Sequence, residues 1–251
     1  MKIDRPSPSL IPQLRNLWKE AFGDSDAFLD CFFSLAYAPE RCRCVTVEGA
    51  VKAALYWLDA NCAGQKFAYL YAVATAADSR SKGLCRMLME DTAAVLKAAG
   101  YQGALLVPQD EGLREMYSRM GYLPAGTIDE FLCAGKAAVP VSELTAAAYS
   151  SLRQNLLPEG SIEIQGVALE FLGKLARFYS GEGFLAAVSR EEEHLRILEY
   201  LGNPDAAPAL VAALGATEAT VRTPGKGLPF AMYRPLSAYC LKPAYYPFAF
   251  D

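Results

Sequence analysis

The 251-residue chain carries 24 Lys and Arg residues against 28 Asp and Glu residues, and 53% of its residues are hydrophobic. This composition fills one large core or two of about 120 residues each, and it excludes a disordered chain. The slight acidic excess, with no run of like charge, excludes the basic surface of proteins that grip nucleic acid or anionic membrane, and it favours a small or cationic partner.

The N-terminal stretch MKIDRPSPSL is too polar for the core of a signal peptide, and no apolar stretch approaches the roughly 18 residues that span a bilayer. We therefore expect a cytoplasmic protein. The seven cysteines, scattered singly apart from Cys42 and Cys44, predict reduced core thiols rather than disulfides or a pair of metal ligands. The one histidine, His194, excludes a multi-histidine metal site, and we expect no metal.

The first elements are predicted to be two helices and three strands. Apolar residues at helical spacing predict a helix over residues 9–22, and a second short helix begins at Ser25 or Asp26. Two strands, RCVTV and VKAALYWLDA, then flank a tight turn and predict an antiparallel pair, and KFAYLYAVAT is the third strand. Residues 81–99 return to a helical pattern.

An apolar run over residues 103–108 predicts a central buried strand, and a helix over 111–120 and a further strand follow it. The second half repeats part of this pattern, because a helix, a glycine and a strand recur over residues 211–224. Residues 184–202 predict two strands that meet at a polar turn. These features indicate duplicated lobes, although any two α/β units can look this much alike.

The most informative stretch, residues 69–90, runs from a strand through a short loop into a helix. A helix start offers unpaired N–H groups and the positive end of the helix dipole, which favour an anion such as a pyrophosphate. Gly83 lets phosphates approach the main chain, and Arg80, Lys82 and Arg86 add positive charge. The sequence therefore predicts one cofactor that bears a diphosphate.

This stretch resembles motif A of the GNAT acetyltransferases, whose pattern is Arg/Gln-x-x-Gly-x-Gly/Ala after a strand. Residues 80–85, RSKGLC, match it except that Cys85 stands at the final small position. The strand at 103–108 and a Tyr-x-x-x-Gly-Tyr element at 117–122 follow in the family's order. The resemblance covers about residues 5–135, and the glycines of a dinucleotide fingerprint or a P-loop are missing.

The resemblance implies an α/β (α+β) GNAT fold, with a mixed, mostly antiparallel sheet flanked by helices. It implies an acetyl-CoA-binding domain over residues 1–135 and a second, degenerate GNAT-like lobe over residues 136–251. Only Gly202-Asn203-Pro204 separates strand from helix in that lobe, which leaves no phosphate loop. We expect it to form one wall of the acceptor cleft.

The resemblance also implies the cofactor contacts and a catalytic acid. Main-chain atoms of Val73, Ala74 and Thr75, at the end of the third strand, bind the pantetheine arm and polarise the thioester carbonyl, and residues 81–86 hold the pyrophosphate. The implied cofactor residues are Val73, Ala74, Thr75, Arg80, Ser81, Lys82, Gly83, Leu84, Cys85 and Arg86. Tyr117 matches the tyrosine that protonates the leaving thiolate, a transfer that suits a phenol of pKa about 10. The alternative is a buried helix aromatic packed with Leu113 and Met120.

The sequence GLCR at residues 83–86 also resembles the GLLR of the enhanced-intracellular-survival acetyltransferases, which join tandem GNAT lobes and act on many amines. That group carries a sterol-carrier-like domain, for which we expect this chain to be too short. Its C-terminal carboxylate enters the active site as a base, which implies a catalytic role for Asp251. The alternative for the tail AYYPFAFD is an edge strand that closes the second lobe.

Most of an alkyl amine is protonated at neutral pH, so a group must take its proton before it attacks the thioester. The first lobe has no histidine, which leaves a carboxylate, a backbone carbonyl or water as the base. Asp24, Asp26 and Asp30 lie around the first two helices, the acceptor wall of the family. We expect Asp26, Asp30, Phe33 and Tyr71 to bind the acceptor. A helix cap, a solvated face and core packing are the alternatives.

The resemblance implies an N-acetyltransferase that moves an acetyl group from acetyl-CoA to a primary amine by direct attack, through positioning and carbonyl polarisation. The acceptor is a small molecule or a peptide amine, and a homo-oligomer stays open. A module that senses acyl-CoA without turnover is the alternative from another class. A transferase that uses aminoacyl-tRNA is disfavoured by the acidic balance.

Overall fold

The computed structural model describes residues 1–191 and 194–250. The elements of the first half are β1 (Lys2–Asp4), α1 (Ile11–Phe22), α2 (Asp26–Leu35), β2 (Cys42–Val47), β3 (Ala50–Cys62), β4 (Gln65–Thr75), α3 (Leu84–Ala98), β5 (Gly103–Leu106), α4 (Glu111–Ser118) and β6 (Leu123–Ala134). The helices and strands predicted here are confirmed. Helix α3 begins three residues later than predicted, because Ser81 and Gly83 hold left-handed φ angles of 61° and 79°.

The elements of the second half are β7 (Ser142–Leu144), α5 (Ala146–Leu156), β8 (Ile162–Ile164), α6 (Gly166–Leu175), β9 (Arg177–Gly181), β10 (Phe184–Glu191), β11 (His194–Gly202), α7 (Ala207–Ala213), β12 (Glu218–Pro224) and β13 (Leu228–Pro235). The two strands predicted over 184–202 and the helix and strand predicted over 211–224 are confirmed. No helix of the described residues is long and apolar enough to cross a membrane.

The described strands form one 13-stranded sheet in the order β1-β2-β3-β4-β5-β13-β6-β12-β11-β10-β9-β7, and β8 pairs with β3 beside this path. The pairs β4–β5 and β11–β12 are parallel, whereas the other pairs are antiparallel. A mixed, mostly antiparallel sheet flanked by helices was the predicted fold class, and it is confirmed.

The two halves repeat one order of elements and exchange their last strands. In each half a short strand and two helices precede an antiparallel run of three strands, a helix and a parallel strand. Strand β13 of the second half pairs with β5 of the first, and β6 of the first half pairs with β12 of the second. The halves are therefore joined through the sheet, and the boundary at residue 135 stays a prediction.

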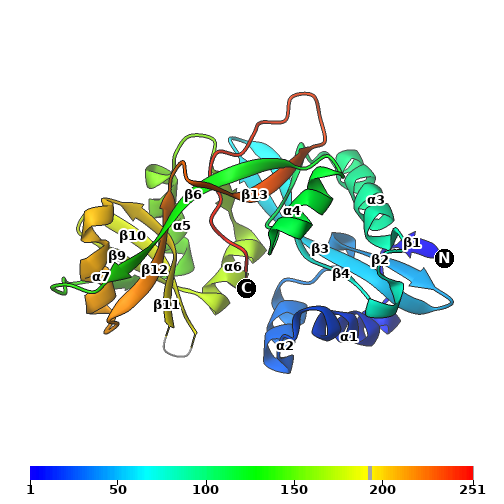
Figure 1. Ribbon diagram of the computed structural model, residues 1–251, viewed down its shortest axis with the longest axis horizontal. Helices are drawn as coiled ribbons and strands as arrows, with labels where there is room; N and C mark the ends of the chain where they lie inside the picture. The colour runs from blue at the N-terminus through cyan, green and yellow to red at the C-terminus, as the bar shows by residue number, and fades with distance from the viewer. Residues whose placement is uncertain (192–193, 251) are drawn as a thin grey trace.

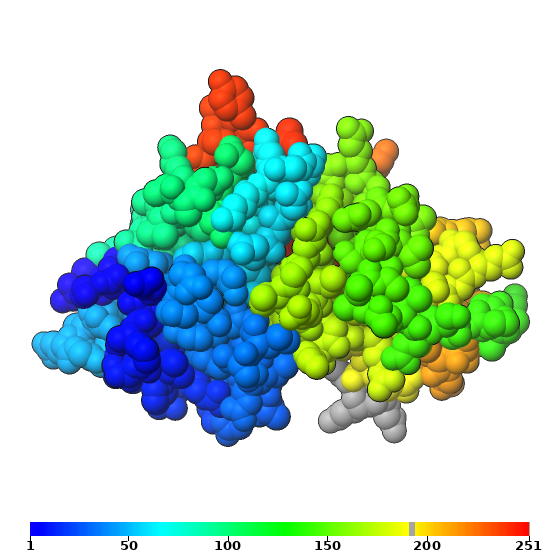
Figure 2. Space-filling model, turned by 180° about the vertical axis from the view of Figure 1, so that it is seen from behind, coloured from blue at the N-terminus to red at the C-terminus, as the bar shows by residue number. Residues whose placement is uncertain are grey.

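Helices cover both faces of the first half's sheet (Figure 1). Alternate residues of β3 point to opposite faces. Ala54, Tyr56 and Leu58 join the core beneath α1 and α2, whereas Leu55 and Trp57 join the core beneath α3 and α4. Figure 2 shows the two halves packed side by side, with the loop after β13 projecting from the surface.

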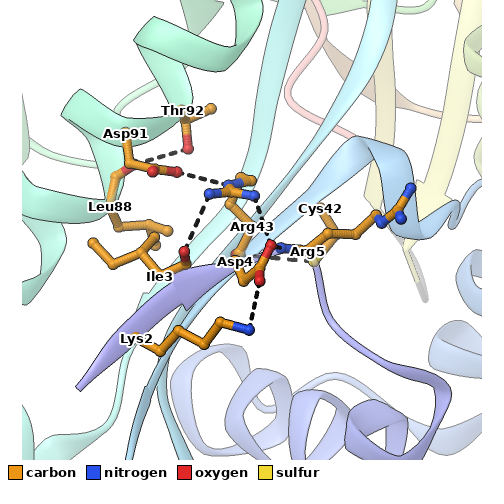
Figure 3. A network of polar contacts seen from close by, with 9 residues as sticks. All are labelled: Lys2, Ile3, Asp4, Arg5, Cys42, Arg43, Leu88, Asp91 and Thr92. Carbon is orange, nitrogen blue, oxygen red and sulfur yellow. Dashed lines mark hydrogen bonds and ion pairs between the residues drawn. The ribbon is translucent and has the colours of Figure 1, made fainter.

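A polar network ties β1 and β2 to α3, the helix that follows the predicted cofactor loop (Figure 3). Arg43 on β2 donates from Nε to the Asp91 carboxylate at 2.6 Å and from Nη2 to the Ile3 carbonyl at 3.3 Å. Asp4 lies 3.5 Å from the same guanidinium and forms an ion pair with Lys2 at 2.7 Å. The network holds α3 against the edge of the sheet.

We expect Arg43→Met to lower the free energy of unfolding by about 1–3 kcal/mol, because it leaves the Asp91 carboxylate and the Ile3 carbonyl without their donor. The Arg43 side chain is only 13% exposed. Lys2→Met is the matched control, since its exposed ion pair with Asp4 contributes less than about 1 kcal/mol. Urea unfolding measures both, and equal midpoints for Arg43→Met and the wild type would contradict a stabilising network.

Candidate active site

A cavity of about 390 Å³ lies in the first half, where β4 and β5 part. The two strands pair in parallel only between residues 67–69 and 103–105. Beyond this pairing the register of β4 shifts, and Ala72 holds a left-handed φ of 47°. A bulge of this kind bends its strand. The cavity opens there, between residues 69–73 of β4 and residues 106–109 after β5.

The loop from β4 to α3 exposes the start of a helix. Gly83 is the residue before α3, at φ 79°, and a Cβ placed on it would meet no atom within 4 Å. No side chain caps this helix start, and its first turn holds no acidic residue. Its first N–H groups and the positive end of its dipole therefore face open space.

Cations surround this helix start and are held in place by main-chain carbonyls. The three donations are from Arg80 to Thr75 at 3.1 Å, from Lys82 to Asp78 at 2.7 Å and from Arg86 to Arg119 at 2.8 Å. Within residues 1–191 and 194–250 no salt bridge joins these three cations to an acid, so the loop presents net positive charge beside an uncapped helix. This combination favours an anion.

The other residues assigned to the cofactor lie on β4, before this loop, and on α3, after it. Val73 lines the cavity and Ala74, next along β4, is buried. Leu84 and Cys85 turn toward the apolar layer beneath α3. Burial raises the pKa of the Cys85 thiol to about 11, so this cysteine is a neutral packing residue near pH 7.

Tyr117 reaches the cavity from α4, a helix capped by Asp110, whose side chain accepts from the Leu113 N–H at 2.7 Å. The tyrosine is 6% exposed, and its ring packs edge-on against Tyr122. In the described part of the chain no partner hydrogen-bonds its hydroxyl. Burial, with the neighbouring Cys85, raises the pKa of Tyr117 above its ordinary value. The hydroxyl therefore stays protonated and free to donate.

The last described residues enter the same cavity, and they do not form the edge strand that was the alternative prediction for the tail. The Tyr69 hydroxyl donates to the Ala249 carbonyl at 2.8 Å, and the Tyr71 hydroxyl donates to the Phe250 carbonyl at 2.6 Å. The Phe250 ring stacks on Phe171 of α6, so the tail lies between the two halves (Figure 1). Asp251, the predicted base, lies outside the described residues.

Two arginines of the second half hold the tail. Arg222 on β12 lines the cavity, donates to the Pro247 carbonyl at 3.3 Å and pairs with Glu130 at 2.6 Å. Arg153 pairs with Glu199 in the core at 2.7 Å and lies over the Phe248 ring. Arg222 was not predicted from the sequence, because β12, EATVRTP, mixes charged, polar and apolar residues and gives no clear signal for it.

Of the residues predicted to bind the acceptor, one lines the cavity, the two acids lie on the surface, and Phe33 packs half-buried against the core. Tyr71 lines the cavity, whereas Asp26, Asp30 and Phe33 lie outside its lining. The Lys19 ammonium, 2.5 Å from Asp26, holds the pKa of that carboxyl below its ordinary value. Asp30 pairs with Arg15 at 2.7 Å on the exposed face of α2. Asp26 is the first residue of α2 and Asp30 follows it by four residues, about one turn, so both acids lie on one outward face.

Asp24, marked by the sequence only as one of three acids, is the carboxylate that lines the cavity. Helix α1 ends at Gly23, with φ 75°, and the Ser25 hydroxyl caps α2 by accepting from the Phe28 N–H. Asp24 thus occupies a sharp corner between two helices. It accepts from Trp18 Nε1 at 2.7 Å.

Residues 2–125 match the family model described as the acetyltransferase (GNAT) domain. The first half of the chain is a GNAT domain. A GNAT acetyltransferase domain supports acyl transfer as the general activity. No curated protein sequence matches the chain.

Solved structures resemble the GNAT domain and the second half together. The likeness to a GCN5-related N-acetyltransferase from Kribbella flavida has a TM-score of 0.71 at 16% identity, over 93% of this chain and 70% of that one. Eis1 from Mycobacterium abscessus has a TM-score of 0.66 at 11% identity, over 94% and 74%. A putative acetyltransferase from Pyrococcus horikoshii has a TM-score of 0.65 at 11% identity, over 98% of this chain and 92% of that one. Such identities show the fold, and the expected tandem-lobe architecture is confirmed.

Proposed function

We propose that the protein transfers an acetyl group from acetyl-CoA to a primary amine by direct attack. One observation carries this proposal. The cavity of about 390 Å³ joins the bulged strand at Val73, Tyr117 and the end of the tail, and the same strand leads through the loop to the uncapped start of α3.

Acetyl-CoA fits this arrangement. The pyrophosphate would lie at the N–H groups of residues 83–86, among Arg80, Lys82 and Arg86, where the helix dipole and three cations favour negative charge. The pantetheine arm would follow residues 73–75 through the opening between β4 and β5. Main-chain N–H groups at the bulge then polarise the thioester carbonyl, as an oxyanion hole does.

The transfer needs one base and one acid. The proposed base is the side-chain carboxylate of Asp251, which follows Phe250, and the Phe250 carbonyl is held at the cavity by Tyr71. It takes a proton from the ammonium, and the free amine forms a bond to the thioester carbonyl carbon. When the carbon–sulfur bond breaks, the thiolate takes the proton of the Tyr117 hydroxyl, and the second proton that the attacking nitrogen loses restores this hydroxyl.

The competing function is an acyl-CoA sensor, and an assay of thiol release separates the two. With wild-type protein and acetyl-CoA, we expect thiol release that depends on an added primary amine. Asp251→Asn should lower the rate at least about tenfold at pH 7, and this loss should shrink as the pH nears the amine pKa of about 10, where no base is needed. Tight binding of acetyl-CoA without amine-dependent release would favour the sensor.

A further inference from the structure

Aromatic rings form the wall of the cavity on the side away from α4. They come from both halves of the chain, namely Trp18, Phe22, Tyr69, Tyr71, Phe230 and Phe250. The Trp18 and Tyr71 rings lie 5.4 Å apart and the Tyr71 and Phe250 rings 6.1 Å apart, so the wall is continuous. Rings of this kind favour apolar or aromatic groups, and their faces attract a cation.

The charges that face this wall are few. Of the described residues that line the cavity, only Asp24 and Arg222 are charged. Arg222 is neutralised by Glu130 at 2.6 Å and stacks on Phe230 at 4.4 Å. Asp24 accepts from the neutral Trp18 indole at 2.7 Å, and it has no cation within ion-pair distance among residues 1–191 and 194–250. Among the described residues that line the cavity, Asp24 is therefore the carboxylate left to meet a cation from outside. Asp251, the proposed base, takes up a proton instead of holding the cation.

A polycation with many hydroxyl groups does not suit this lining. Each hydroxyl that leaves water for an aromatic surface without a partner costs free energy, and extra ammonium groups find few carboxylates. A single ammonium on an apolar skeleton meets Asp24 and the ring faces together. The volume must also receive the acetyl end of the cofactor, which limits the acceptor to a small molecule.

We infer that the acceptor is a small primary amine with a single positive charge on an aromatic or branched apolar skeleton, recognised by Asp24 and the aromatic wall. This inference rests on the proposed acetyl transfer and names its substrate class. Asp24 attracts the ammonium form that predominates at neutral pH, and the rings bury the carbon skeleton.

The test compares 2-phenylethylamine, butylamine and spermidine as acceptors for the wild type and for variants. We expect kcat/KM for 2-phenylethylamine to exceed that for the other two by about tenfold or more. Phe22→Ala, at a partly exposed residue, should raise KM for 2-phenylethylamine about fivefold and leave KM for butylamine within about twofold. Asp24→Asn should raise KM for both monoamines about tenfold without changing KM for acetyl-CoA.

Asp205→Asn, an exposed acid of the second half, is the matched control and should behave as the wild type. Spermidine as the best acceptor, or unchanged KM values in both cavity variants, would overturn the inference and leave acetyl transfer intact. Titration of 2-phenylethylamine into protein saturated with CoA measures the affinity of the acceptor site for the amine without turnover. Binding that Asp24→Asn weakens supports the inference even if no amine is acetylated, a result that would overturn the proposed function alone.

Discussion

Tyr117→Phe is expected to lower kcat about 100-fold, because it removes the hydroxyl that donates a proton to the leaving thiolate. The ring stays and keeps its packing against Tyr122, so the free energy of unfolding and the affinity for acetyl-CoA should change little. Steady-state kinetics of thiol release measures the effect. Calorimetric titration of acetyl-CoA into the same variant is the control for binding.

The pH dependence tests the same residue. Burial raises the pKa of Tyr117, so its hydroxyl remains protonated well into the alkaline range. The wild-type rate should therefore rise with pH as the amine loses its proton, without a fall below about pH 10. A fall near pH 8, or an unchanged kcat in Tyr117→Phe, would show that Tyr117 is only the packed helix aromatic that the sequence left as an alternative.

Gly83→Glu is expected to weaken acetyl-CoA binding by at least about 100-fold, because it places a carboxylate where the pyrophosphate should lie. Two variants separate charge from backbone strain. Gly83→Ala adds only the strain of a left-handed φ of 79°, about 1–2 kcal/mol, and Gly83→Gln matches the size of glutamate without its charge.

Calorimetric titration of acetyl-CoA into the three variants gives the affinities. Weak binding by Gly83→Glu with near-normal binding by Gly83→Gln is the expected pattern, since space around this residue is open. Equal losses of affinity in Gly83→Glu and Gly83→Gln would show that backbone strain, and not the added charge, weakens binding. Normal binding by Gly83→Glu would place the pyrophosphate elsewhere.

The sequence predicts much of the first half because its information there is local. Helical spacing marked α1 and an apolar run marked β5, whereas the helical pattern over residues 81–99 placed the start of α3 three residues too early. The cofactor loop follows from this order, because a strand, a glycine and a helix start are neighbours in the chain.

Local sequence patterns do not predict which distant segments pair with each other. No periodicity indicates that β13 lies between β5 and β6, because the register depends on packing across the whole sheet. The position of the tail could not be predicted either, because an aromatic run fits an edge strand as well as a segment buried between the two halves. Its path depends on the Tyr69 and Tyr71 hydroxyls, which lie far away in the chain.

Which of the three acids around α1 and α2 faces the cavity depends on the residue at which α2 begins. Because α2 starts after the Ser25 cap, Asp26 and Asp30 point outward and form ion pairs, whereas Asp24 stays in the corner and faces the cavity. From the sequence, Asp26 and Asp30 were predicted to bind the acceptor and Asp24 was not. The three-dimensional position of Trp18, which donates to Asp24, separates them.

The most direct measurement is mass spectrometry of the acceptor after incubation of the wild-type protein with acetyl-CoA and a panel of primary amines. Acetyl transfer predicts that at least one amine gains the mass of one acetyl group, in amounts equal to the free thiol released, and that Gly83→Glu abolishes both. Thiol release without any acetylated amine, or no binding of acetyl-CoA by the wild type, would contradict amine acetylation at this cavity.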